Sequence, residues 1–116
     1  MSVILYETLT QEQLRGCLRY VGCEIDEVDQ YEGSARATGV HVIQHDGVKV
    51  TCEVTLHARE GLCLVDIVTA NTPCTDVEGE YVSLANWQCG NARAVVNLLE
   101  RSFSQIAYDV FGETYG

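Results

Sequence analysis

The stretch from residue 48 to residue 57 constrains the fold most, because apolar and polar residues alternate in it without a break. The apolar members of this alternation are Val48, Val50, Cys52, Val54 and Leu56. A period of two residues is typical of a β-strand in an antiparallel sheet, with one face buried and the other in water. The flanking sequences "HDG" (45–47) and "REG" (59–61) each predict a hairpin turn. We therefore predict a central antiparallel strand with a neighbour on both sides.

The length of the first hairpin turn decides which face of the preceding strand is buried, because a shift of one residue reverses the faces. A two-residue turn at Asp46–Gly47 would place three residues on the core side, namely His41, Ile43 and His45. A three-residue loop that includes His45 would instead place Val40 and Val42 on the core side and leave His41 in water. We favour the three-residue loop, because it buries two valines.

The second hairpin is best closed by a two-residue turn at Glu60–Gly61. This turn places three apolar side chains in the core, Cys63, Val65 and Ile67, and leaves Asp66 outside. The outer face of the same strand then carries Leu62, Leu64 and Val68. These exposed apolar residues make a homodimer a further candidate assembly.

Two helices are predicted from their end signals and apolar spacing. Thr10 and Gln13 form a capping box ahead of a short helix, which ends at Gly22. Asn91 can cap a second helix that ends at Gly112, and its apolar stripe includes Val95, Leu98, Leu99, Phe103, Ile106 and Val110. At about 20 residues this helix is roughly 30 Å long, enough to cross a whole sheet.

The remaining segments complete a single domain. Residues 3–6 and the stretch from Cys23 to Gly33 are predicted strands, residues 71–80 a loop, and residues 81–87 an edge strand. The predicted fold is therefore α+β. It is an antiparallel β-meander of four to five strands, with a short N-terminal helix and a long C-terminal amphipathic helix packed on one face. All 116 residues fit one compact domain.

Charge gives the main indication of function. The chain carries 17 acidic and 7 basic residues, a net charge of −10. Such a surface repels nucleic acid and anionic membranes, so we expect no direct contact with either, and it attracts basic partners. The acidic residues that we predict to bind a partner are Glu24, Asp26, Glu27, Asp29, Glu32, Asp76, Glu78 and Glu80. The alternative is that they form a solvated face that maintains solubility.

Cys89 is the candidate for enzymatic chemistry. It lies just before the predicted start of the second helix at Asn91, where a helix dipole lowers the pKa of a thiol. Arg93 follows after three residues, too few for the wide anion-binding loop that a thiol phosphatase needs between its cysteine and its arginine. We therefore assign no catalytic residue and keep Cys89 as a weaker candidate nucleophile.

Metal and cofactor sites are not predicted. A zinc site could draw on His41, His45, His57 and Glu53, but in the favoured register these side chains do not converge. The acidic residues lack the spacing of a calcium-binding loop, and the sequence has no phosphate-binding or dinucleotide-binding glycine motif. We expect no cofactor.

The six cysteines, at positions 17, 23, 52, 63, 74 and 89, could form three disulfides because their number is even. Several fall on predicted core faces and there is no CxxC motif, so we favour free thiols and a reducing, cytoplasmic location. The sequence has no apolar stretch long enough for a membrane span.

These observations favour a non-enzymatic acidic binding protein. It would act as an adaptor, chaperone or inhibitor that docks on a basic surface of a protein or of a nucleic-acid-binding protein, in the latter case as a nucleic-acid mimic. An alternative is a domain that binds a small apolar ligand between the sheet and the C-terminal helix, since "LCLVDIV" (62–68) is apolar on both faces. A Cys89-dependent enzyme is the third reading.

Overall fold

The structure is a computed structural model that describes residues 9–70, 77–83 and 91–112. Along the chain it contains α1 (Gln11–Tyr20), β1 (Glu24–Tyr31), β2 (Ser34–His45), β3 (Val48–Arg59), β4 (Leu62–Ala70), β5 (Val77–Ser83) and α2 (Asn91–Phe111). The predicted strand at residues 3–6 lies outside the described residues, as do Cys74, Asp76 and Cys89.

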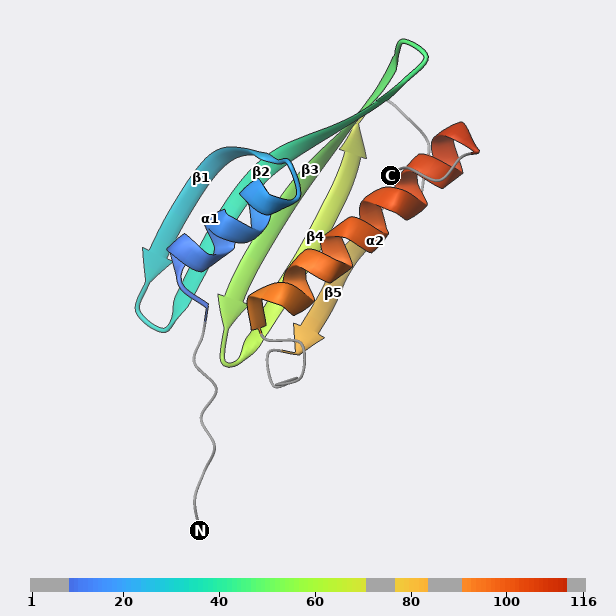
Figure 1. Cartoon of the computed structure of the whole chain (residues 1–116). Coiled ribbons are helices and arrows are strands. Elements are labelled where there is room, and N and C mark those ends of the chain that lie inside the picture. Colours follow the sequence, from blue (N-terminus) through green and yellow to red (C-terminus); the bar gives the residue numbers. More distant parts are fainter. Residues whose placement is uncertain (1–8, 71–76, 84–90, 113–116) are drawn as a thin grey trace.

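The five strands form one antiparallel sheet in the order β1-β2-β3-β4-β5, which is a simple meander. Both helices lie on the same face of the sheet (Figure 1). α1 packs on β1 and β2, and α2 contacts β2, β5 and α1. This arrangement confirms the predicted α+β class, with a short first helix and a long last helix on one face.

The two helices begin and end as their signals predict. The Thr10 side chain accepts a hydrogen bond from the Gln13 N–H, and the Gln13 side chain accepts one from the Thr10 N–H, which completes the capping box. Gly22 and Gly112 follow α1 and α2 with positive φ angles of 85° and 70°. A residue with a side chain rarely adopts such angles, so glycine ends each helix.

The register of the first hairpin differs from the favoured prediction. Asp46 and Gly47 form a two-residue turn with φ angles of 49° and 79°. Two positive φ angles match the twist of a two-stranded ribbon, which explains why Asp-Gly selects the shorter turn. His41 therefore pairs with Cys52 on the helix side of the sheet and is 8% exposed, whereas Val42 is 45% exposed.

The second hairpin has the predicted register. Glu60 and Gly61 form a two-residue turn with φ angles of 51° and 73°, so that Arg59 pairs with Leu62. Cys63, Val65 and Ile67 are fully buried in the core, as predicted. The following edge strand also exists, but it begins at Val77, within the predicted loop at residues 71–80. Pairing of Val77 with Ile67 explains this earlier start.

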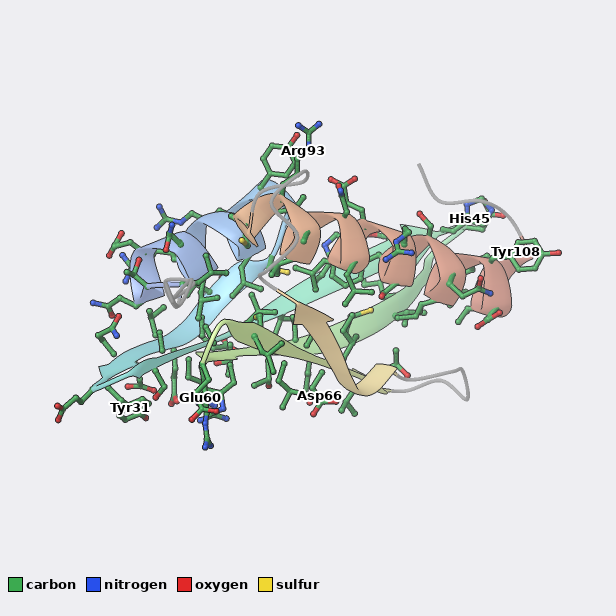
Figure 2. The ribbon with its side chains drawn as sticks, turned by 90° about the horizontal axis from the view of Figure 1, so that it is seen from below. Tyr31, His45, Glu60, Asp66, Arg93 and Tyr108 are labelled. Carbon is green, nitrogen blue, oxygen red and sulfur yellow. The ribbon has the colours of Figure 1, made fainter. Side chains whose placement is uncertain are left out.

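The core lies between the sheet and the helices. Along β3 the buried residues are Val50, Cys52, Val54, Leu56 and Ala58. They face the apolar stripe of α2, which buries Val95, Leu98, Leu99, Phe103 and Ile106. Figure 2 shows the other face of the sheet, where Tyr31, Glu60 and Asp66 lie away from the helices.

Candidate functional site

The acidic residues of β1 lie along one edge of the sheet. Glu24, Glu27 and Asp29 pair with Val40, Thr38 and Arg36 of β2, and this register places them on the face opposite the helices. Asp26 is the extra residue of a bulge between Ile25 and Glu27. A bulge twists the edge of a sheet, and it gives this strand an additional carboxylate.

We define the acidic edge as Glu24, Asp26, Glu27, Asp29 and Glu32. Four of these residues are exposed, and Asp29 is half-buried. The ion pairs between described residues join other acids to neighbouring arginines: Arg15 to Glu12 at 3.5 Å and Arg59 to Glu60 at 3.8 Å. His45 Nε2 lies 3.3 Å from Asp46 Oδ2. Within the described part of the chain, no carboxylate of the acidic edge forms such a pair, although Arg36 lies opposite Asp29 in the register.

The second predicted acidic group is far from the first. Glu78 and Glu80 belong to β5, at the opposite edge of the sheet from β1, and Asp76 lies outside the described residues. Strands β2, β3 and β4 lie between the two edge strands, so that β1 and β5 are separated by four inter-strand steps. At about 4.8 Å per step, the distance between the two edges is roughly 19 Å. The predicted partner-binding residues therefore divide into two surfaces, and the acidic edge of β1 is the one whose side chains are described.

The three histidines do not form a metal site. His41 and His45 lie on the helix side of the sheet, and His57, which pairs with Leu64 and Arg36, lies on the other side with Glu53. Among the described residues no cluster of three potential ligands is found. Two details of the prediction were wrong, because His41 is buried rather than solvated and His45 is the last residue of β2 rather than part of a loop.

His41 has a specific environment that the sequence did not predict. Its ring stacks on Phe103 with centroids 4.2 Å apart, and Nδ1 lies 3.2 Å from the carbonyl oxygen of Gly22. A carbonyl only accepts hydrogen bonds, so the neutral ring donates through Nδ1–H. Burial lowers the pKa of His41, and the bond to Gly22 opposes this effect in part. The residue thus joins β2 to the end of α1 and to α2.

Four cysteines are buried and form no disulfide, namely Cys17, Cys23, Cys52 and Cys63. Burial raises the pKa of Cys17 to about 11 and those of Cys23 and Cys63 to about 12. A thiol with such a pKa is protonated at neutral pH and is a poor nucleophile. The prediction of thiols without disulfides is therefore confirmed for these four. The raised pKa values make Cys17, Cys23 and Cys63 unsuited to thiolate chemistry.

The environment of Cys89 is not described, so its role as a nucleophile stays a prediction. Its proposed partner Arg93 is exposed on the first turns of α2 (Figure 2). There it borders a groove between α1 and α2, on the outer side of the two helices.

We call this feature the interhelix groove. It has a volume of about 510 Å³, and the apolar part of its lining is Gly16, Cys17, Ala92 and Val96. The Cys17 thiol donates to the carbonyl oxygen of Ala92 at 3.5 Å and thereby ties the two helices together beneath the groove. Ala92 and Val96 are half-buried against the core.

The interhelix groove is not the ligand pocket suggested by the sequence, which was expected between the sheet and α2. The described part of that interface is filled by side chains such as Val95, Leu99 and Ile106, each at most 1% exposed. At its edge, beside the end of α1, His41 and Phe103 border a hollow of about 470 Å³ that also touches Tyr20 and Glu100. The small residues Gly16 and Ala92 leave room for the groove, but the sequence alone does not indicate that they meet.

A search for membrane-crossing helices finds none in the part of the chain that the structure describes. Comparisons of the chain with protein-family models, with curated proteins and with solved structures find no match.

Proposed function

We propose that this protein is a non-enzymatic binding protein that docks on a basic partner through its acidic edge. The observation that carries the proposal is a row of exposed carboxylates without a described ion-pair partner. Glu24, Asp26 and Glu27 belong to the edge strand β1, and Glu32 belongs to the turn that follows it. Charges arranged in this way are available to a partner, and they speed association through electrostatic attraction.

The placement of the charges along β1 supports a protein surface as the partner. Glu24 and Glu27 are on the outer face of the strand, and Glu32 is at the turn that follows. Glu27 and Asp29 are two residues apart on this face, which is roughly 7 Å along the strand and resembles the distance between neighbouring phosphates of one nucleic-acid strand. A protein that binds nucleic acid is therefore a suitable basic partner, with this chain as its inhibitor or chaperone.

A competing explanation is that the carboxylates protect the edge strand. Charged residues on an edge strand keep two sheets from pairing edge to edge. Both explanations require exposed acids on β1, but only docking predicts a partner that is lost when these acids are neutralised.

The test is capture of partners from host lysate at about 0.1 M salt with tagged protein, followed by a wash at about 0.5 M, where charge attraction is screened. A β1 variant carries Glu24→Gln, Asp26→Asn, Glu27→Gln and Asp29→Asn. A matched control removes the same number of charges elsewhere through Glu12→Gln, Glu53→Gln, Glu60→Gln and Asp109→Asn.

The proposal predicts a basic protein in stoichiometric amount with the native chain and the control, released by the high-salt wash and absent with the β1 variant. Duplex DNA added to the lysate should compete for that protein if the acidic edge imitates nucleic acid. Recovery of the same proteins by the β1 variant and the control would refute docking through the acidic edge.

A further inference from the structure

The interhelix groove has the size and lining of a ligand site. Its volume of about 510 Å³ falls in the range of small-molecule sites, which are concave and mostly apolar with a few polar groups. Its apolar lining comes from Gly16 and Cys17 on α1 and from Ala92 and Val96 on α2. An added Cβ at Gly16 would meet no atom within 4 Å, so the space above this glycine is open.

The polar groups at the rim define two ends of opposite charge. Arg93 lies near the start of α2, where the helix dipole also favours an anion. Glu100 lies seven residues further along the same helix, about two turns or roughly 10 Å away. Asn97, between them, offers an amide to a polar group in the middle of a ligand.

We propose that the interhelix groove binds a short extended zwitterion with an apolar body, of the class of a hydrophobic tripeptide. Its carboxylate would lie at Arg93, its amine at Glu100 and its side chains over Gly16, Ala92 and Val96. Three extended residues span at most about 10–11 Å, which matches the rise of roughly 10 Å between the backbone positions of Arg93 and Glu100.

The net charge of the protein favours this class over a simple anion. At a net charge of −10 the chain repels a ligand that carries only negative charge. A zwitterion has no net charge, so it meets no such repulsion and still uses both ends of the groove. The site is independent of the acidic edge, because no residue of β1 lines it.

Titration of ¹⁵N-labelled protein with trileucine tests the proposal through amide chemical shifts. We expect shifts confined to residues 13–20 and 92–100. N-acetyl-trileucine lacks the amine and trileucine amide lacks the carboxylate, so each should bind more weakly, by up to about fivefold as for one exposed ion pair. Equal binding of all three peptides, or shifts elsewhere, would overturn the proposal.

Variants separate the groove from non-specific binding. Gly16→Phe fills the groove and should reduce the affinity for trileucine at least tenfold, whereas Gly16→Ala should retain it. Asn97→Phe fills the groove from the side of α2. It should also reduce the affinity for trileucine, and it replaces Gly16→Phe as the test if that variant does not fold. Arg93→Gln should reduce the affinity for trileucine but not the affinity for trileucine amide. Arg101→Gln, at another exposed position of α2, should leave both affinities unchanged. Unaltered binding to both phenylalanine variants would refute the site.

Discussion

The rings of His41 and Phe103 stack with centroids 4.2 Å apart and planes inclined by 20°. His41 belongs to β2 and Phe103 to α2, so this contact links the register of the first hairpin to the position of the long helix. The hydrogen bond from His41 Nδ1 to the Gly22 carbonyl adds the end of α1 to the same contact. A single neutral imidazole thus connects three elements of the fold.

Acid should weaken the fold through His41. Because burial lowers the pKa of His41 in the folded state below 6.5, the unfolded chain takes up a proton first as the pH falls. The free energy of unfolding is therefore fully retained above about pH 6.5 and decreases as the pH falls through 6.5 toward the folded-state pKa. Urea unfolding at several values between pH 7.5 and pH 5 measures this decrease.

Two variants assign the pH dependence to His41. His41→Phe retains an aromatic ring against Phe103 but loses the bond to Gly22, which should cost roughly 1 kcal/mol at pH 7.5. Its stability should then depend less on pH between 7.5 and 5 than that of the native chain. His57→Gln, on the other face of the sheet, should retain the native dependence, and a native slope in His41→Phe would contradict the assignment.

Gly39 should tolerate no side chain. A Cβ at this position would lie 2.9 Å from the carbonyl oxygen of Glu24 and 3.3 Å from Cys23 Cβ. Gly39→Ala must therefore separate β1 from β2, and we expect a loss of roughly 1–3 kcal/mol in the free energy of unfolding. Gly16→Ala is the matched control: it lies in an open helix position and should stabilise by about 0.5–1 kcal/mol. Equal melting temperatures of the two variants would refute this account.

The capping box of α1 should contribute measurably to stability. Thr10→Ala removes the acceptor for the Gln13 N–H, and loss of such a cap costs about 1 kcal/mol. Thr10→Ser retains the hydroxyl and should stay close to the native value. Urea denaturation compares the three proteins, and a native-like Thr10→Ala would show that α1 is held by packing alone.

The buried thiols should resist alkylation. The raised pKa values of Cys17, Cys23 and Cys63 and the burial of Cys52 predict slow reaction with iodoacetamide at pH 7.5 in the folded chain and fast reaction in urea. Peptide mass spectrometry of labelled protein measures each rate. Rapid labelling of these four in the folded chain would contradict their burial, and rapid labelling of Cys89 alone would support the enzyme reading instead.

Local sequence patterns predicted most of the fold. The alternation along β3, the Glu60–Gly61 turn and the caps at Thr10 and Gly22 each depend on residues close together in the chain, so their structures follow from local rules. The first hairpin is different, because two local signals favoured opposite registers: the Asp46–Gly47 pair favours a two-residue turn, and the burial of two valines favours a longer loop. The acceptor for His41 is the Gly22 carbonyl, and its stacking partner is Phe103 of α2, so the benefit of burying it depends on distant residues.

The candidate sites depend on how the elements are arranged. The acidic residues of β1 were recognised as a group in the sequence, but their separation from Glu78 and Glu80 follows from strand order, because a meander places its first and last strands at opposite edges. The interhelix groove could not be predicted, since Gly16 and Ala92 become neighbours only when α1 packs on α2.

The affinity for the captured basic partner at two salt concentrations tests docking through the acidic edge most directly. Dissociation constants would be measured at about 0.1 M and 0.5 M salt for the native chain, the β1 variant and the matched control. Docking predicts that the native chain and the control bind the partner tightly at low salt, and that their affinity falls roughly tenfold or more at high salt. The β1 variant should already be weak at low salt and respond little to salt. A β1 variant that binds as tightly as the control, with the same salt dependence, would contradict the account.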